Sequence, residues 1–488
     1  MNNLFLSAKY HNTTNNVVQS IPPTATDNVV QFKVNPLQAI KAAKSLGKDI
    51  TESYSKNKKN KERKKLTAIE RTNQRATQRQ YFFKLQKTAS EILPTERVAY
   101  CHNCRADFKK NVFIKVNQTA SSGTKAKFGN VFVCDDIWRC PVCAKKIYFE
   151  RGKEVQKAID VHNHQNGKVV SMLTLTISHS RDDDLAWLLK KLAEAKKRLF
   201  GDRLMRKVFE QMRLVGHITN TEFTHGDNGW HPHHHIIVFA DYDVEKFAVD
   251  TIAVLPMVDE FGGLYYSYVD NKKEQVLIKK KQDHLVEQVS FEHFMKIQWQ
   301  KFCRAVGLKN PSYEHGLTLQ GAEKAGEYVS KFQTAMELTD SMNKEGRAKN
   351  RNQWQILHDA NLGDAQSKAL FFEYAKATKF KRQLAWSKGL KDKFGIADLS
   401  DEELNELEEV AESEITSQKY IDLDWDHWLV VVRHRLQPLL LNLCEKFGAD
   451  YTAQYINDNF GKGVTLVVDS YEKLRQFDVK GVELKQRV

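Results

Sequence analysis

Two pairs of cysteines, far apart in the sequence, restrict the fold of this chain more than any other feature. The pairs are Cys101-x-x-Cys104 and Cys140-x-x-Cys143. Each pair places two thiols on one side of a tight turn, and two such turns complete a tetrahedral set of sulfur ligands. The spacing therefore predicts a closed, structural zinc site formed by these four cysteines, within a zinc ribbon at residues 96–150.

The stretch between the two pairs complicates this prediction. It spans 35 residues, whereas about 15–20 residues are usual in four-cysteine sites. Two apolar runs, 113–116 and 128–133, can fill the gap as an extended hairpin. Cys134 follows directly and could compete with the paired cysteines as a ligand.

The cysteine count also indicates a compartment. Seven cysteines, of which four stand in pairs, are typical of a metal site in a reducing compartment rather than of a disulfide scaffold. No apolar run approaches the ~18 residues of a membrane helix, and the first ten residues lack the pattern of a secretory signal. We therefore expect a cytoplasmic protein with no membrane partner.

Length and charge suggest a multidomain protein that contacts nucleic acid. The chain has 488 residues, enough for two or three domains, and a net charge of +14. Residues 1–100 contain 18 basic and 7 acidic side chains. Most of the excess thus lies in a basic N-terminal region, 1–95, which we expect to be partly disordered. Such a flank suits the phosphate backbone of DNA, and a purely solvated tail explains the charge equally well.

The densest polar motif is WHPHHHIIVF at residues 230–239. Alternate side chains of a strand share a face, so His233 and His235 point together and His234 points away. His231 has the same parity and is a further candidate. Because isoleucine and valine follow at once, the histidines stand at the start of a buried strand. Two neutral imidazoles on one strand form half of a site for a divalent metal.

Strands and helices interleave around this motif. Strands are predicted at 169–178, 216–225, 233–239 and 312–320, and helices at 185–200, from about 244, and at 289–306. Glu222 lies on the strand that forms a hairpin with the histidine strand, where it can add a carboxylate ligand. The fold class is therefore α+β: an antiparallel sheet with flanking helices at 151–340, followed by a mainly helical region at 341–488.

One tyrosine stands in a setting that suits nucleophilic attack. Tyr328 lies in EKAGEYVSKF, which is predicted to be helical, and Lys331 follows on the same face of that helix. A tyrosine beside a metal-bound phosphate can act as a nucleophile, and a neighbouring lysine can favour the phenolate or steady the phosphate. Tyr313, in the preceding predicted strand, lacks this setting.

In their order along the chain these motifs resemble the HUH endonucleases, specifically the replication initiators (Rep proteins) of small rolling-circle plasmids. MLTLT (172–176) looks like the first motif of that family, WHPHHHIIVF like its metal-binding motif, and EYVSKF like its tyrosine motif. The stretch 373–395 is similar to a segment beyond the tyrosine, and the paired cysteines also match. The resemblance runs from about residue 96 to residue 410.

The resemblance implies a nickase with an HUH nuclease domain at 151–340. His233, His235 and Glu222 would hold Mg²⁺ or Mn²⁺ beside single-stranded or cruciform origin DNA. Tyr328 would attack one strand, forming a 5′-phosphotyrosine and freeing a 3′-hydroxyl that primes the host polymerase, before the strand is rejoined. No Walker A sequence is present, so a helicase would come from the host.

Two departures from the family's motifs stand out. The middle of its histidine triplet is usually apolar, and here it is His234. Some relatives place a glutamate four residues before the tyrosine to activate water at termination, and residue 324 here is a lysine. The nearest carboxylates, Glu323 and Glu327, do not share the helical face of Tyr328, so the sequence identifies no termination base.

Two other functions fit the same sequence. An HUH-type transposase with a zinc module would share the chemistry and differ in its DNA context. A zinc-ribbon DNA-binding protein without catalysis would use its histidines structurally.

Overall fold

The computed structural model describes residues 68–120, 123–164, 170–258, 264–269, 285–321, 350–407, 412–460 and 465–468. The mixture of helices and antiparallel sheets in these residues confirms the α+β class. No helix in the described residues is long and apolar enough to cross a membrane.

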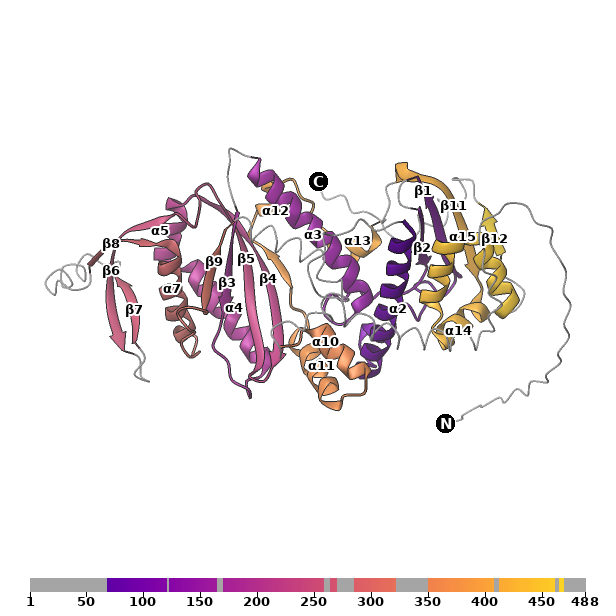
Figure 1. Cartoon of the computed structure of the whole chain (residues 1–488), viewed down its shortest axis with the longest axis horizontal. Helices are drawn as coiled ribbons and strands as arrows, with labels where there is room; N and C mark the ends of the chain where they lie inside the picture. The colour runs from indigo at the N-terminus through magenta and orange to yellow at the C-terminus, as the bar shows by residue number, and fades with distance from the viewer. Residues whose placement is uncertain are drawn as a thin grey trace. The chain divides into compact units, whose positions relative to one another are not determined.

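A five-stranded antiparallel sheet carries the histidine motif (Figure 1). Its order is β10-β4-β5-β3-β9, with β3 at Val170–Thr176, β4 at Leu214–Gly226, β5 at Gly229–Ala240, β9 at Leu317–Gln320 and β10 at Leu384–Trp386. The predicted strands at 169–178, 216–225 and 233–239 correspond to β3, β4 and β5. The strand predicted at 312–320 forms only over its last four residues. Because β10 pairs with β4, this sheet extends past the domain boundary expected at residue 340.

A tight turn fixes the register of the two central strands. Gly226 pairs with Gly229, so β4 and β5 form a hairpin with a two-residue loop. Gly229 has φ of 81°, and a Cβ there would meet the carbonyl oxygen of Arg181 at 2.9 Å. Glycine is therefore required at this turn for its conformation and for its small size.

Helices cover both faces of the sheet, as the alternation of apolar residues along β5 requires. Ile236 and Val238 belong to the core that includes α4 (Leu185–Gly201) and α7 (Phe291–Ala305). Ile237 and Phe239 point to the other side, against Val155 of α3 (Pro141–Asn163). Beyond the histidines, β5 is therefore buried on both faces.

Further elements complete this part of the chain. They are α2 (Ala68–Ile92), α5 (Arg203–Gln211), α10 (Gln353–Asn361), α11 (Ala365–Ala377), α12 (Leu390–Lys393) and α13 (Asp401–Glu406). The prediction of a helix from about residue 244 is wrong, because the strand β6 (Ala248–Val258) follows instead. It pairs with β7 (Leu264–Val269) and β8 (Leu285–Ser290) in a small separate sheet. The β-branched residues of β6 favour this extended form.

The cysteine-rich segment and the C-terminal region share a second sheet (Figure 1). Its order is β12-β11-β1-β2, with β1 at Val112–Thr119, β2 at Gly123–Gly129, β11 at Ile415–Leu423 and β12 at Thr465–Val468. The hairpin expected between the cysteine pairs is present as β1 and β2, but β2 overlaps the predicted run 128–133 only at residues 128–129. The C-terminal region contributes two strands as well as helices, so it is less helical than the sequence suggested.

One apolar core holds this second sheet to its helices. Ile114 of β1, Phe128 of β2 and Ile421 of β11 pack against α14 (Trp425–His434) and α15 (Gln437–Phe460). Trp428 of α14 is 1% exposed and meets the ring of Phe128 at 5.6 Å in an edge-on contact. Residues separated by about 300 positions therefore form one folding unit, which we call the composite module (residues 105–131 and 415–468).

We predict that Trp428→Ala loosens the distant hairpin. Removing this buried side chain should lower the free energy of unfolding by about 3–5 kcal/mol. Because β1 shares its core, hydrogen exchange measured by mass spectrometry should speed up in Val112–Thr119. Leu429→Ala, on the exposed side of the same helix, is the control and should leave exchange unchanged. Unaltered protection of β1 in Trp428→Ala would show that the hairpin folds without the C-terminal region.

Candidate functional site

Three side chains converge at the open end of the central sheet. In the antiparallel register, Glu222 of β4 stands directly opposite His233 of β5. His235 lies two residues further along the same face. The Nε2 atoms of His233 and His235 each lie 3.6 Å from Oε2 of Glu222. The three predicted metal ligands are thus brought together, with ligand atoms within 4.8 Å of one another.

Neighbouring polar groups orient these ligands. Thr174 of β3 places Oγ1 3.0 Å from Nδ1 of His235, and the Nδ2 amide of Asn220 donates to Oε1 of Glu222 at 2.7 Å. Nδ1 of His233 lies 3.3 Å from the carbonyl oxygen of His231. With Nδ1 of each ring occupied, the Nε2 atoms are left to face the carboxylate, as metal-binding histidines require.

The donor set fits a divalent ion. Burial lowers the pKa of His235 to about 4, although Glu222 partly opposes this shift. His235 is therefore neutral at pH 7, with an imidazole nitrogen ready to coordinate. Two imidazoles and one carboxylate leave open coordination positions, and the Glu222 side chain is 38% exposed. Such a site could hold a divalent ion together with a ligand from solution.

His231, the further candidate ligand, has a different partner. Its Nδ1 lies 2.8 Å from Nε2 of His179, whose Nδ1 lies 3.0 Å from the carbonyl oxygen of Asn228. Burial lowers the pKa of His231 to about 4. His231 is not in the group that could hold a metal in the described residues. His179, which the sequence analysis did not single out, borders the site through this contact.

The opposite face of the same strands holds a second polar group. His234 is 6% exposed, and its Nδ1 lies 3.1 Å from Oγ1 of Thr221. Lys196 of α4 donates to Oγ1 of Thr219 at 2.6 Å, and burial lowers its pKa to about 8. Burial, reinforced by Lys196, lowers the pKa of His217 to about 3. The prediction that His234 points away from the metal ligands is confirmed by its register and burial.

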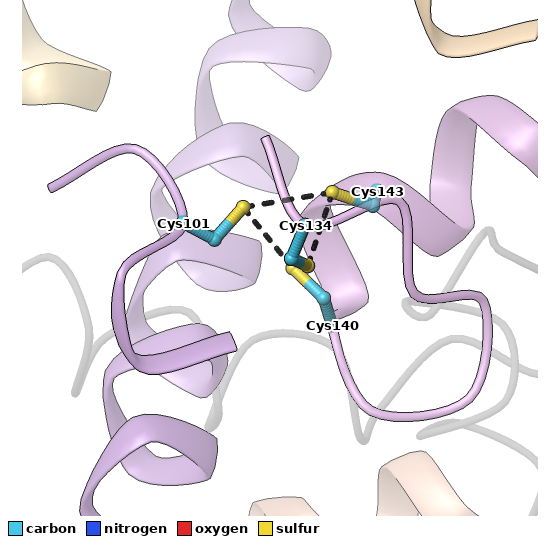
Figure 2. Close-up of side chains that lie close together, drawn as sticks. All are labelled: Cys101, Cys134, Cys140 and Cys143. Atoms are coloured by element: carbon cyan, nitrogen blue, oxygen red, sulfur yellow. Dashed lines mark hydrogen bonds between the residues drawn. The ribbon is translucent and has the colours of Figure 1, made fainter. Parts of the chain in front are cut away.

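Four cysteines form a second cluster, at the start of α3 (Figure 2). Its members are Cys101, Cys134, Cys140 and Cys143, all buried. The Sγ atoms of Cys101 and Cys134 each lie 3.6 Å from that of Cys143, and those of Cys140 and Cys101 are 3.8 Å apart. A tetrahedral ion with Zn–S bonds of about 2.3 Å separates its sulfurs by about 3.8 Å. The observed spacing fits zinc closely.

The electrostatics of the cluster are compatible with a bound cation. Burial raises the pKa of the Cys140 thiol well above its usual value, whereas the three neighbouring sulfurs lower that of Cys143 by hydrogen bonding. Four buried thiols cannot all ionise without a positive ion among them. Closed and without an open position, the cluster matches a structural site.

One predicted ligand is replaced by another. Cys104 lies outside the cluster and is partly exposed, and Cys134 takes its place. The backbone explains the exchange: the N–H of His102 donates to the carbonyl of Phe132, and the N–H of Phe132 donates to the carbonyl of Cys104. These two backbone hydrogen bonds hold Cys134 close to Cys101. The sequence signal was available, since Cys134 was recognised as a competitor.

The predicted nucleophile cannot be compared with this geometry. Tyr328, Lys331, Glu323 and Glu327 all lie outside the described residues. Tyr313, the nearest competing tyrosine, is 39% exposed and contacts Nδ1 of His293 through its hydroxyl.

Comparison with known proteins identifies the central region. Residues 126–247 match the family model described as "Replication protein". This segment therefore resembles a replication protein domain. The domain contains Glu222, His233 and His235, together with three of the clustered cysteines.

A relative extends the similarity beyond this domain. The chain is 25% identical over 354 residues to "Protein rep" of Streptomyces lividans, covering 60% of this chain and 70% of the relative. The resemblance to Rep proteins of rolling-circle plasmids is thereby confirmed. No solved structure matches.

We predict that Cys134 and not Cys104 retains zinc. Cys134→Ser should release about one zinc per chain and lower the melting temperature, because the bound ion contributes directly to folding. Cys104→Ser is the matched control and should keep both the zinc and the stability. Metal content measured on the purified variants distinguishes them. Equal zinc loss in both, or zinc-free wild-type protein, would contradict the assignment.

A second prediction concerns the pH dependence of stability. The unfolded His217 takes up a proton near pH 6.5, whereas the folded one does so only near pH 3. As the pH falls below 6.5 the unfolded state therefore gains the proton first, and stability is lost. His217→Leu should reduce the fall in the free energy of unfolding between pH 7 and pH 5 by about 1–2 kcal/mol. Urea denaturation measures the free energy of unfolding of both proteins. If it falls equally with pH in the wild type and in His217→Leu, this role is refuted.

Proposed function

We propose that the protein initiates rolling-circle replication of a plasmid by nicking one strand at the origin. The observation that carries the proposal is the convergence of Glu222, His233 and His235 on the central strands of a replication protein domain. An oriented pair of imidazoles with one carboxylate is a donor set that metal-dependent nucleases use. The proposed HUH nuclease domain, 151–340, includes β3, β4, β5 and β9 of this sheet, and β10 extends it.

The three side chains would hold a divalent ion, Mg²⁺ or Mn²⁺, which when bound polarises a phosphoryl oxygen. Thr174 and Asn220 keep His235 and Glu222 in place through the contacts described above. Partial exposure of Glu222 leaves room for a DNA phosphate at this end of the sheet.

The nucleophile in this proposal is Tyr328. Its phenolic oxygen attacks the scissile phosphorus, the bond from phosphorus to the 3′-oxygen breaks, and a 5′-phosphotyrosine forms. The released 3′-hydroxyl takes up a proton and serves as the primer. Attack by a 3′-hydroxyl on the phosphotyrosine reverses the step and rejoins the strand without ATP. Lys331 would stabilise the phenolate or the phosphate.

The proposal includes partners. Elongation would need a host polymerase and a host helicase, in the cytoplasm, with origin DNA presented as a single strand or a cruciform. A transposase with the same chemistry and a non-catalytic zinc-ribbon DNA-binding protein are the alternatives. The match to a replication protein family favours the initiator.

We predict that Tyr328→Phe abolishes the covalent adduct. The change removes only the attacking oxygen, so the folded protein should form no phosphotyrosine with single-stranded origin DNA in Mn²⁺ or Mg²⁺. Denaturing electrophoresis and mass spectrometry would measure the adduct, which in the wild type should lie on the peptide containing Glu327-Tyr328-Val329. Tyr313→Phe is the matched control and should retain the adduct. An adduct on Tyr313, or one that persists in Tyr328→Phe, would refute the assignment.

The metal ligands are tested in the same assay. His233→Ala and His235→Ala should each reduce nicking by several orders of magnitude while leaving DNA binding largely intact, because phosphate contacts come mainly from lysine and arginine. His234→Leu, on the opposite face of β5, should retain nicking. Wild-type rates in either alanine variant would show that the ligands are elsewhere.

A further inference from the structure

Among the described residues, Phe380 is the most exposed large apolar side chain, with 94% of its surface in solvent. It follows the end of α11 at Ala377 by three residues, and its backbone has φ of 62°. This left-handed conformation strains any residue with a Cβ, and glycine is the usual choice for it near the end of a helix. An aromatic ring that is both strained and exposed adds little to the stability of the fold, so its presence points to a function.

Hydrogen bonds fix the backbone next to Phe380. The N–H of Lys381 donates to the carbonyl oxygen of Thr378 at 3.0 Å. The carbonyl oxygen of Lys381 in turn accepts a hydrogen bond from the indole Nε1 of Trp138 at 2.7 Å, and Trp138 is buried. The ring of Phe380 is therefore exposed on a loop that is held in place from inside the protein.

The pairing of β10 with β4 places this loop near the candidate metal site. Just before β10 begins, the carbonyl oxygen of Gln383 accepts a hydrogen bond from the N–H of Thr221 at 2.9 Å. Thr221 adjoins Glu222, and Phe380 precedes Gln383 by three residues. Paired Cα atoms are about 5.5 Å apart and each residue spans at most about 3.6 Å, so the Cα atoms of Phe380 and Glu222 lie within about 20 Å of each other. A few nucleotides of single-stranded DNA span that distance.

The loop is also strongly basic. Residues 374–391 contain six basic side chains and no acidic one. Two of the six pair with carboxylates elsewhere: Lys379 with Glu96 and Lys391 with Asp398. Lys381 and Arg382, which follow Phe380 directly, are both exposed. The exposed ring is thus flanked by positive charge on the side that leads to β10.

We propose that Phe380 stacks on an unpaired base of the DNA strand at the nuclease site, while Lys381 and Arg382 contact the neighbouring phosphates. Aromatic rings combined with cations recognise single strands in this way, because every base has a flat face. A protein partner would need an apolar surface wider than one ring, whereas the residues on both sides of Phe380 are charged. The identity of the strand rests on the proposed function, and the stacking itself concerns binding alone.

The test is equilibrium binding of the full-length protein to a fluorescent 20-nucleotide oligothymidylate, measured by anisotropy without added divalent metal. Phe380→Gly should weaken binding by about tenfold, because the contact between one base and the ring is lost. The melting temperature should not fall, since glycine suits the left-handed backbone. Phe380→Trp should retain the affinity, because an indole ring offers a flat face at the same position.

A matched pair of variants separates stacking from a general apolar effect. Phe380→Leu keeps an apolar side chain without a flat ring, and it should weaken binding as Phe380→Gly does. Phe447 of α15, in the composite module, is 49% exposed and has Nζ of Lys446 5.3 Å from its ring centre. Phe447→Leu removes a similar ring beside a similar cation and should leave binding unchanged.

The phosphate contacts have a different readout. Lys381→Gln combined with Arg382→Gln should reduce the slope of log affinity against log salt by about 1.4, since each phosphate contact to a single strand contributes about 0.7. Phe380→Gly should leave that slope unchanged, because the ring carries no charge.

Four results would overturn the proposal. The first is a wild-type protein that does not bind the oligothymidylate, or a Phe380→Leu variant that binds it as tightly as Phe447→Leu. The second is a fall in melting temperature in Phe380→Gly, which would give the ring a structural role. The third is an unchanged salt dependence in the double variant. The fourth is an abasic oligomer of the same length that loses as much affinity as the oligothymidylate when Phe380 is replaced.

These outcomes are independent of the nicking chemistry. If Tyr328→Phe kept its covalent adduct while Phe380→Gly lost affinity for the oligothymidylate, the assigned nucleophile would be wrong and the stacking would stand. If Phe380→Gly bound normally while Tyr328→Phe lost the adduct, the proposed function would stand without the stacking.

Discussion

The alternation of side chains along β5 is the constraint on which the central region depends. The odd-numbered residues His233 and His235 lie beside Glu222. The next two odd-numbered residues, Ile237 and Phe239, pack in the core on the side of α3. The even-numbered residues of β5, from His234 onward, face α4. A shift of one residue in the pairing with β4 would turn His233 and His235 toward α4 and place His234 on the face of Glu222. The turn at Gly229 excludes that shift, so the geometry of the candidate site and the stability of the sheet follow from the same register.

Much of this site was predictable because its determinants are local. The histidine strand, the hairpin and the helix capped by Asp184 each depend on residues that are close in sequence. Their pattern of apolar and polar residues therefore predicted β4, β5 and α4, and with them the convergence of Glu222, His233 and His235. The contact between His179 and His231 was missed because it joins a loop to a strand, and no periodicity in either segment indicates it.

The second sheet shows where such reasoning fails. Pairing of β1 with β11 brings Ile114 next to Ile421, across about 300 residues of chain. The apolar run 113–116 predicted the strand β1, but no strand was predicted at β11, and the pattern of a strand does not name its partner. The same limit explains the cysteine error. Spacing favoured Cys104, whereas the ladder between residues 102–104 and Phe132 selects Cys134.

The two candidate metal sites differ in the net charge of the ion with its ligands, and this difference indicates different roles. Four thiolates around one divalent ion carry a net charge of −2, and this cluster is buried and closed. A phosphate would be repelled from it, so its contribution is to stability. Two neutral imidazoles and one carboxylate around a divalent ion instead carry a net charge of +1, and Glu222 is partly open to solvent. Of the two sites, only the second would attract a phosphodiester, and it lies within the segment that matches the replication protein family. In the proposed function, ligand chemistry and burial together would therefore direct DNA toward β4 and β5, and the cysteines would hold the chain that surrounds them.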